Sequence, residues 1–418
     1  MKLGVVLLFG ATASLSAFGA GEKCPFPQHS VYASGTIKTT SQSQTDLDRA
    51  VVDFYRAWKK KYLRSDGEGR RYVFCNAEKS MSPKNIASVS EGHGYGMLVA
   101  VLMAGADPEA QADFDGLYRF FRAHPAEHHA DLMAWRQASQ GKGLALTEGR
   151  DDRQSATDGD LDIACALLMA DRQWGSGGAI DYRKEAGKVI AAIQRAETDP
   201  QRQTLTLGSW VSEEGPRSRL RNGLRTSDFM PAHLKSFAAA TGDLRWTGIV
   251  DATYRLLGGL LSAHSPQTGL LPDFVQWKAG SYQPAPPKFL EGIHDGCYSY
   301  NACRVPWRVG TDALLTGDPR SRALLAPLNA WAEKTTGGDP QKINAGYELD
   351  GRSLSKDSSA AFIGPLAVAA MSDPARQAWL NALWADLLAR KPDAEDYYGN
   401  SVKLLTMIVI SGNWWQPF

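Results

Sequence analysis

A glutamate beside a run of glycines is the first residue in this sequence whose setting suggests chemistry. Glu91 stands in the segment 90–97, where three of the five residues that follow it are glycine. Glycine removes side chains and lets a ligand approach the backbone closely. Apolar and aromatic neighbours such as Tyr95 would raise the pKa of the Glu91 carboxyl group, which suits a general acid. The structural alternative is that Glu91 only occupies the first turn of a helix, where a carboxylate is stabilised.

Asp158, Asp160 and Asp162 form a second acidic group. Their alternation is similar to the opening of a calcium-binding loop, but the glutamate that closes such a loop is absent, so calcium is disfavoured. Asp158 and Asp162 are spaced to share one face at the start of a helix, where the helix dipole stabilises anions. Capping explains one such acid, and we therefore expect at least one of the three to face a cleft.

The segment 290–308 combines acids, aromatic rings and polar side chains. Glu291 and Asp295 could each activate a water molecule. The groups that could stack on a ring or bind hydroxyls are Tyr298, Tyr300, Trp307, Asn301, Arg304 and Arg308. The alternative is a disulfide-stapled loop that carries aromatic residues on its surface.

Two further long loops, 205–228 and 270–308, add charged and aromatic residues, including Arg225, Asp228, Asp273, Trp210 and Trp277. Together they predict an acidic, aromatic-lined groove. A cofactor pocket is not expected, because the sequence has neither a phosphate-binding glycine loop nor a nucleophile elbow. No metal is expected either, since His93 has no second ligand at suitable spacing.

The elements that must position these residues are helical. Apolar residues recur with helical spacing over 46–62, 94–104, 161–170, 182–197, 232–240, 246–262, 320–335, 358–370, 374–388 and 397–410. Almost nothing alternates as a long strand does. Without a repeated sequence motif, this all-α pattern allows either an irregular bundle or a toroid of helical hairpins, whose inner helix ends can face one cleft.

The N-terminus predicts an export signal over residues 1–19. Lys2 provides a positive start, residues 3–15 are mostly apolar, and Ala17 and Gly19 are small residues suited to cleavage. The apolar run is broken and shorter than the roughly 20 residues of a membrane span. We therefore expect a secreted or periplasmic protein without a membrane anchor after cleavage, folded as a single domain over 20–418.

The charge balance and the cysteines add two expectations. Lys plus Arg number 46 against 45 acidic residues, so no overall field attracts nucleic acid. Five cysteines in an exported chain suggest two disulfides and one free thiol. Cys165 lies in an apolar helical run and is the expected free thiol. The pairing that we favour joins Cys297 to Cys303 and Cys24 to Cys75, although four cysteines permit other connectivities.

The motif segments resemble those of glycoside hydrolase family 8. Residues 156–174 are similar to the signature of that family over their whole length, and 90–97 and 301–308 are similar to its catalytic-acid and third segments. Residues 24–28 and 226–230 extend the resemblance over nearly the whole mature chain. It implies an (α/α)6 barrel, an inverting mechanism, and activity on cellulose, mixed-linkage glucan, xylan or chitosan.

The resemblance also implies roles for individual residues. By position, Glu91 would be the proton donor, and Asp158 would hold the distorted sugar beside the scissile bond. Asn301 departs from the cellulase-like subgroup, in which an aspartate at that position is the base. In the subgroup of bacterial chitosanases and lichenases, asparagine is usual there and a glutamate from an inserted loop is the base. Glu291 is similar to that glutamate, and Asp295 is the second candidate.

A further set of residues is expected to bind the polysaccharide. It consists of Tyr95, Asp160, Trp210, Arg225, Asp228, Asp295, Tyr300, Asn301, Arg304 and Trp307. Chitosan is cationic and would be favoured by additional carboxylates in the cleft, for which this chain offers Asp152, Asp160, Asp162, Asp228, Asp273 and Asp295. We therefore expect a monomeric chitosanase with β-glucanase activity.

Three other functions remain open. Neutral β-glucans need only stacking and hydroxyl contacts, so an endo-1,4-β-glucanase without chitosanase activity is the close alternative. An inactive polysaccharide-binding homologue is suggested only by Asn301, which cannot act as a base at neutral pH. A polysaccharide lyase on the same type of toroid would need a Tyr or His base and positive charge for a uronate.

Overall fold

Twelve α-helices make up most of the regular structure in the described part of the chain. The computed structural model describes residues 21–79, 85–140, 143–146, 150–211 and 218–418, so the predicted export signal lies outside it. The helices are α1 (Gln44–Tyr62), α2 (Ser90–Leu102), α3 (Ala110–Ala123), α4 (Thr157–Trp174), α5 (Tyr182–Ala196), α6 (Pro231–Thr241), α7 (Arg245–His264), α8 (Val305–Thr316), α9 (Pro319–Thr336), α10 (Ala360–Ala370), α11 (Gln377–Ala389) and α12 (Tyr397–Ile410). Among these described helices, none has both the length and the apolar character to span a bilayer.

The helices are of two kinds, one buried on all sides and the other amphipathic. Every residue of α10 is buried, and Glu91 is the only residue of α2 that is not. By contrast, α1 buries one stripe that includes Leu47, Val51, Phe54 and Trp58, and it exposes its charged face. A helix that is apolar all round belongs in a core, whereas an amphipathic helix covers one.

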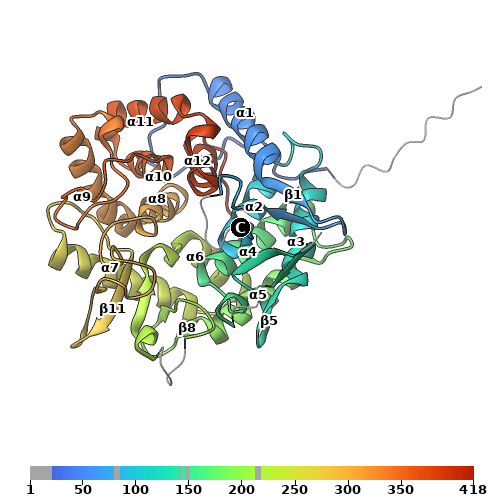
Figure 1. Cartoon of the computed structure of the whole chain (residues 1–418). Coiled ribbons are helices and arrows are strands. Elements are labelled where there is room, and N and C mark those ends of the chain that lie inside the picture. Colours follow the sequence, from blue (N-terminus) through green and yellow to red (C-terminus); the bar gives the residue numbers. More distant parts are fainter. Residues whose placement is uncertain (1–20, 80–84, 141–142, 147–149, 212–217) are drawn as a thin grey trace, which may run out of the picture.

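The even-numbered helices form a closed inner ring. Each contacts the next from α2 to α12, and α12 contacts α2. Among the odd-numbered helices, α3, α5, α7, α9 and α11 each contact the inner helix that precedes them, and α1 contacts α12. Figure 1 shows this inner ring surrounded by the outer helices. The architecture is an (α/α)6 barrel, which confirms the predicted fold class and decides between toroid and bundle.

The alternation of inner and outer helices sets the direction of the ring. Because the chain reverses between one helix and the next, the six inner helices run parallel and their N-termini meet at one face. A helix N-terminus carries partial positive charge and unsatisfied N–H groups, so this face favours acidic side chains.

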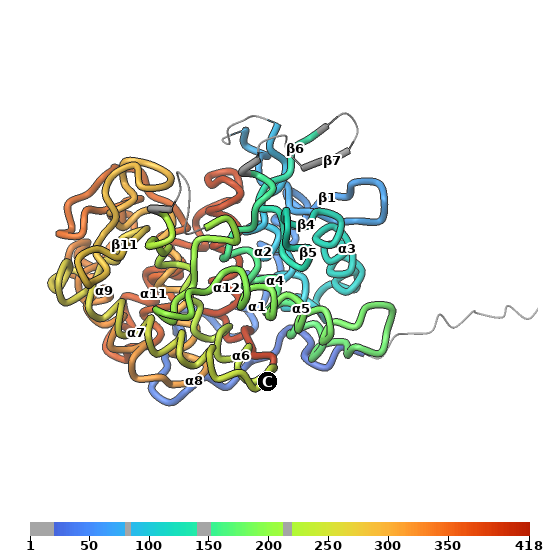
Figure 2. Tube along the Cα trace, turned by 90° about the horizontal axis from the view of Figure 1, so that it is seen from below, coloured from blue at the N-terminus to red at the C-terminus, as the bar shows by residue number. Residues whose placement is uncertain are grey.

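Short antiparallel strands lie in the segments that connect the helices of the ring. They pair as β1 (Leu63–Ser65) with β2 (Arg71–Val73), β4 (Pro125–Ala126) with β5 (His129–Met133), and β8 (Thr198–Asp199) with β9 (Thr204–Leu205). Two three-stranded sheets have the orders β3 (Ile86–Val89), β6 (Arg136–Gln140), β7 (Gly143–Leu146) and β10 (Gly223–Arg225), β11 (Phe274–Lys278), β12 (Ser281–Pro284). Figure 2 shows β1, β4, β6 and β7 toward one face of the ring and the C-terminus at the other.

Ten of the helices lie where the periodicity predicts them, and two do not. Helix α3 lies outside the predicted ranges, although its apolar stripe of Phe114, Leu117 and Phe121 has helical spacing. Helix α8 buries ten residues between Val305 and Leu314, so it lacks the one-sided pattern by which a surface helix is recognised.

The predicted disulfides are wrong. All five cysteines are free and buried, which confirms only the prediction for Cys165. The Cys297 Sγ donates to Glu348 Oε2 at 3.3 Å, while Cys303 Sγ donates to the Tyr300 carbonyl oxygen at 3.3 Å. Short spacing in the sequence therefore did not bring Cys297 and Cys303 together, because the 3₁₀ helix η4 (Ala302–Arg304) carries Cys303 into the core.

Candidate active site

Residues at or just before the starts of four inner helices, α2, α4, α8 and α12, line a cleft of about 450 Å³. Glu91 is the second residue of α2, Asp158 is the second residue of α4, and Tyr397 is the first residue of α12. Asn301 precedes η4, which leads directly into α8. All four line the cleft together with Ser90, Val89, Trp135, Ala156, Arg225, Glu291, Tyr300, Asp396 and Tyr398. The ring thus gathers side chains that are far apart in the sequence.

Arg304 organises the floor of this cleft. Its Nη1 donates to Glu91 Oε2 at 2.6 Å, to Asp158 Oδ2 at 2.9 Å and to Tyr95 Oη at 3.2 Å. Its Nη2 donates to Asn301 Oδ1 at 2.9 Å. Because its side chain is only 2 % exposed, the guanidinium is a fixed charge beneath the acids rather than a free ligand for substrate.

Glu91 has the environment of a general acid. Its Oε1 accepts a hydrogen bond from Tyr397 Oη at 2.8 Å, and its side chain is 20 % exposed. Burial raises the pKa of Glu91, and although Arg304 opposes this, the nearby Asp158 carboxylate raises it further, so the net shift is upward. A carboxyl group that keeps its proton toward neutral pH can deliver it to a leaving oxygen.

Asp158 is held in the opposite protonation state. Burial would raise its pKa, but Arg225 and Arg304 outweigh burial and hold the pKa of Asp158 below its usual range. Its Oδ1 also accepts from the Gly159 backbone N–H at 2.9 Å. Glu91 and Asp158 are therefore two carboxyl groups in one cleft whose environments move their pKa values apart, as acid–base sites require.

Glu291 is connected to Glu91 by hydrogen bonds through Asn301 and Arg304. Its Oε2 accepts from Asn301 Nδ2 at 2.8 Å and its Oε1 accepts from Arg225 Nη2 at 3.3 Å. The side chain is 49 % exposed and reaches open solvent. The amide at position 301 thus serves as a hydrogen-bond donor to the neighbouring glutamate.

Asp295 does not face the cleft, which contradicts its prediction as a substrate ligand and as the second candidate for the base. Its Oδ2 accepts from the backbone N–H groups of Leu290 and Glu291 at 2.7 and 3.0 Å, and its Oδ1 accepts from Gly292 at 2.8 Å. The residue is 3 % exposed. Asp295 therefore shapes the turn that presents Glu291.

Asp273 holds Asn301 from behind. Its Oδ1 accepts from the backbone N–H groups of Ser299, Asn301 and Ala302 at 2.9, 3.2 and 2.6 Å. Burial raises the pKa of Asp273 to about 7, against the effect of these backbone hydrogen bonds. One buried oxygen thus fixes the start of η4, which carries Asn301 and Arg304.

We expect Asp273→Ala to destabilise the protein and Asp273→Asn to be tolerated. The alanine variant leaves three buried N–H groups without an acceptor, and each such loss costs about 1–3 kcal/mol. The asparagine variant keeps an acceptor in place of Oδ1. Urea unfolding of both variants measures the difference, which should exceed about 2 kcal/mol. Equal stabilities would show that the cap on η4 is not needed.

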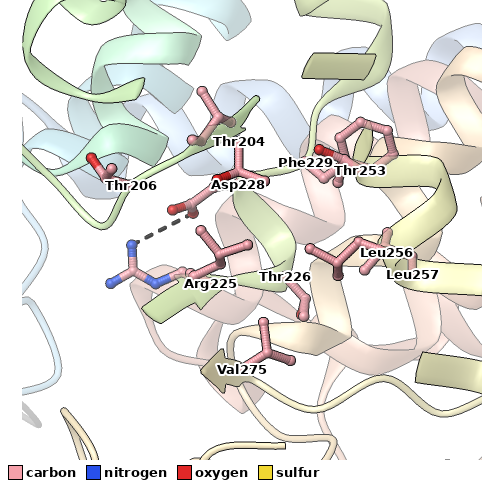
Figure 3. A pocket seen from close by; sticks show the side chains of 12 residues that line it. Thr204, Thr206, Arg225, Thr226, Asp228, Phe229, Thr253, Leu256, Leu257 and Val275 are labelled. Carbon is pink, nitrogen blue, oxygen red and sulfur yellow. Dashed lines mark ion pairs between the residues drawn. The ribbon is translucent and has the colours of Figure 1, made fainter. Parts of the chain in front are cut away.

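Asp228 and Arg225 meet beside a small cavity of about 20 Å³. Figure 3 shows the two side chains facing each other, and the ion pair joins Arg225 Nη1 to Asp228 Oδ1 at 3.5 Å. Burial raises the pKa of Asp228 to about 7, although Arg225 opposes the shift. Asp228, at the end of the 3₁₀ helix η3 (Thr226–Asp228), is 2 % exposed and is not among the residues that line the cleft, so its contact with substrate stays a prediction.

A second arm of about 440 Å³ continues the cleft. It shares Trp135, Ala156, Arg225 and Glu291 with the first arm, so the two form one groove. Its remaining walls are Ser155, Leu207, Trp210, Leu220, Phe289 and Leu290. A long groove with indole rings on its walls suits an extended chain of sugar rings, which present flat apolar faces and polar edges.

Three more predicted substrate ligands lie in the core. Tyr95 and Asp160 are 0 % exposed and Trp307 is 1 % exposed. The Trp307 ring packs between Tyr95 and Trp414, with Arg308 over its face at 3.8 Å. These residues support the cleft from beneath, because the helices that carry them, α2, α4 and α8, are buried over most of their length. Of the other predicted ligands, Trp210, Arg225, Tyr300 and Asn301 do line the groove.

Sequence reasoning missed Trp135, Tyr397 and Tyr398, all of which line the groove. Trp135 precedes a short strand and has Arg136 over its ring at 3.9 Å. The signal for the two tyrosines was available, since they open the last predicted helix. Their role was hidden because nothing in the local sequence says that α12 begins beside Glu91.

The fold and the site together define a class of protein. Carboxyl groups that flank an open, aromatic-lined groove are the arrangement by which glycoside hydrolases cleave their bond. A toroid of α-helices that brings Glu91 and Glu291 to such a groove is a glycoside hydrolase.

Comparison with known proteins gives the family. Residues 24–412 match the model of glycosyl hydrolases family 8. A β-glucanase of Niallia circulans is 45 % identical over 96 % of this chain and 93 % of its own length, and an endoglucanase of Bacillus sp. strain KSM-330 is 39 % identical over 95 % and 83 %. The structure of a β-1,3-1,4-glucanase from Paenibacillus sp. X4 superposes with a TM-score of 0.87 at 44 % identity, covering 94 % of this chain and 99 % of that one. The chain belongs to glycosyl hydrolases family 8.

Proposed function

We propose that this enzyme is an inverting endo-β-1,4-glycosidase whose main substrate is a neutral β-glucan. The observation that carries the proposal is the placement of Glu91 and Glu291 in one groove, with Arg304 and Asn301 between them. The names of the relatives, a β-glucanase, an endoglucanase and a β-1,3-1,4-glucanase, support the choice of substrate class.

Inversion needs an acid on one side of the bond and a base on the other. In such enzymes the two carboxyl groups stand about 6.5–9.5 Å apart, which leaves room for one water molecule. In the proposed reaction Glu91 protonates the leaving oxygen as the bond breaks. Glu291 removes a proton from the water that attacks the anomeric carbon from the opposite side.

The surroundings of the two acids match these roles. The raised pKa of Glu91 keeps a proton ready for transfer. Asn301 and Arg225 each occupy one oxygen of Glu291 and orient the carboxylate, and each oxygen retains a lone pair that can accept a proton from water. The ionised Asp158 can bind hydroxyls of the sugar at the cleavage point and tighten those contacts in the transition state.

The groove favours cleavage within a chain. Glu291 and Arg225 line both arms, so the polymer is proposed to run from one arm into the other past these two residues. A blind pocket on one side would instead select chain ends.

The positions of the carboxylates weaken the case for chitosan. Asp162 is paired with Arg308 at 2.6 Å and with His233 at 3.0 Å, and Asp152 lies 3.4 Å from Arg136. Asp160, Asp228, Asp273 and Asp295 are all buried. Most of the acidic residues that suggested a cationic polymer therefore do not present free charge to the groove. Chitosan stays a second candidate on the resemblance alone.

A panel of polymers tests the substrate. We expect reducing-end release from lichenan and carboxymethylcellulose to exceed release from chitosan by at least about tenfold, which corresponds to about 1.4 kcal/mol in the transition state. The Glu91→Gln protein is the blank. Faster hydrolysis of chitosan would overturn the preference. Binding without any product would indicate an inactive homologue, and an unsaturated product absorbing in the ultraviolet would indicate a lyase.

We also propose export of the protein, on the basis of residues 1–19. The positive start, apolar stretch and small residues support cleavage near Ala20. N-terminal sequencing of the protein recovered from the periplasm and the medium tests this. A protein that retains Met1 and stays in the cytoplasm would contradict it.

A further inference from the structure

Two buried acids beneath the groove take no part in the proposed reaction. Asp160 lies in the first turn of α4 and Glu197 lies just after α5, and both are 0 % exposed. Helices α4 and α5 pack against each other, and the two acids act on each other electrostatically, so that burial and the Glu197 charge both raise the pKa of Asp160. Asp160 Oδ2 and Glu197 Oε2 are buried and have no hydrogen-bond partner among the described residues. Two ionised carboxylates would repel each other in the core, and neither has a hydrogen to donate, so the pair needs a proton on at least one of them.

The other oxygens of the pair attach it to both walls of the second arm. Asp160 Oδ1 accepts from the Met133 backbone N–H at 2.9 Å, two residues before Trp135. Glu197 Oε1 accepts from the Ser155 hydroxyl, and Ser155 Oγ accepts from the Ser209 backbone N–H at 3.0 Å. Ser209 directly precedes Trp210. Each indole of the second arm is therefore one or two residues from a hydrogen bond that leads to the pair.

A backbone hydrogen bond and a second hydroxyl strengthen this connection. The Thr206 backbone N–H donates to the Glu197 carbonyl oxygen at 2.8 Å, and the Thr157 hydroxyl donates to the Thr206 carbonyl oxygen at 2.7 Å. Thr157 is the neighbour of Asp158. The segment between β9 and Trp210 is therefore hydrogen-bonded to the first residue of α4.

We propose that Asp160 and Glu197 share a single proton, and that this pair positions Trp135 and Trp210 relative to Asp158 for polymer binding. Asp160 and Glu197 are positioning residues in this account, since neither reaches the substrate. The part that concerns polymer binding rests on the proposed function. The shared proton does not, because it depends only on the fold.

Loss of the proton would place two negative charges side by side in the core. The charged groups that act on the pair include Asp158 on α4 and Asp228 on η3, both also acidic, with Arg225 on β10 paired to those two. Burial raises the pKa of Glu197 to about 8. Burial raises the pKa of Asp160 as well, so the pair keeps at least one proton at neutral pH, and the contact should weaken in alkali when that proton is lost.

Two substitutions at one position separate charge from shape. Glu197→Gln supplies a permanent N–H to Asp160 and keeps an acceptor for Ser155. Glu197→Ala removes both. We expect the alanine variant to raise KM for soluble β-glucan at least about tenfold while kcat falls less than about threefold. At pH of about 6 the glutamine variant should stay within about twofold of wild type in KM. Glu185→Gln, a buried acid of α5 paired with Lys188, is the matched control.

The pH dependence of stability provides a readout without catalysis. A group whose pKa is higher in the folded than in the unfolded chain binds an extra proton on folding, so the free energy of unfolding falls as pH rises between the two values. For Glu197 these values are 4.5 and about 8. From pH of about 5 to about 8, Tm should therefore fall more steeply in wild type than in Glu197→Gln. Titrations common to both proteins cancel in this comparison.

The outcomes separate the two proposals. Parallel Tm curves for wild type and Glu197→Gln would overturn the shared proton. A difference in Tm with no change in KM, or in glucan affinity on electrophoresis, for Glu197→Ala would overturn the positioning of the tryptophans. If wild type hydrolyses no glucan, the proposed function fails, yet the Tm curves and the affinity measurement still decide the role of the pair.

Discussion

Replacement of Glu91 by glutamine is expected to reduce kcat by about 100-fold to 10,000-fold, the range in which a general acid contributes. Glutamine has the shape and neutral charge of the protonated glutamate, but it cannot release a proton. It can still accept from Arg304 Nη1, which lies 2.6 Å from Glu91 Oε2, and it can still contact the Tyr397 hydroxyl at 2.8 Å. The cleft should therefore keep its structure and its affinity for the polymer.

The Glu91→Gln experiment needs both a rate and an affinity. Initial rates of reducing-end release give kcat, and calorimetric titration with a soluble glucan gives Kd, which should stay within about threefold of wild type. Glu109→Gln is a suitable control, because the side chain of this glutamate is 69 % exposed and pairs with Lys59 at 3.1 Å on the protein surface. More than about a tenth of wild-type kcat in Glu91→Gln would remove this residue from the role of acid.

Replacement of Glu291 by alanine should reduce kcat as strongly as replacement of Glu91, but for a different reason. Without the carboxylate the attacking water keeps its proton, and kcat should again fall by about 100-fold to 10,000-fold. Asp295 offers the comparison, because it is buried, is not among the residues that line the groove, and accepts hydrogen bonds from backbone N–H groups on both of its oxygens. We expect Asp295→Ala to lower Tm, and to lower kcat only as far as the loop of Glu291 is disturbed.

Chemical rescue distinguishes a base from a structural residue. In Glu291→Ala the missing side chain leaves room for a small anion, and azide can attack the anomeric carbon without a base to activate it. Azide should restore product formation in Glu291→Ala and yield an inverted glycosyl azide. It should have no such effect on Asp295→Ala. If azide rescued Asp295→Ala and not Glu291→Ala, Asp295 would be the base and Glu291 the structural residue.

The positions of most helices and of the chemical motifs were available from the sequence. Helical spacing of apolar residues is a local property, and it indicated ten of the twelve helices. Glu91, Asp158, Glu291 and Asn301 stand in segments whose composition marks them, and all four line the groove. Helix α8 was not predicted, because a helix that is buried on nearly every side does not show the one-sided apolar pattern of a surface helix.

The depth of each acidic side chain was decided by tertiary structure. Asp158 and Asp160 are neighbours in one motif, yet the first lines the cleft and the second lies fully buried in the core. Their different roles depend on which face of α4 meets α2 and which meets the segment after α5. The local sequence does not indicate which face of α4 packs against which neighbour. The acidic composition of the loops therefore predicted more free negative charge in the groove than the structure has.

The network that tunes the site also depends on the closed ring. Arg304 binds Glu91 across 213 residues of chain, and Tyr397 binds Glu91 across 306. Such contacts exist only after α12 has packed against α2 and the parallel inner helices present their N-termini at one face. Sequence by itself therefore determined which segments are helical and which residues are suited to chemistry. Tertiary structure determined which of those residues meet, because burial and charge pairing are set by partners hundreds of positions away.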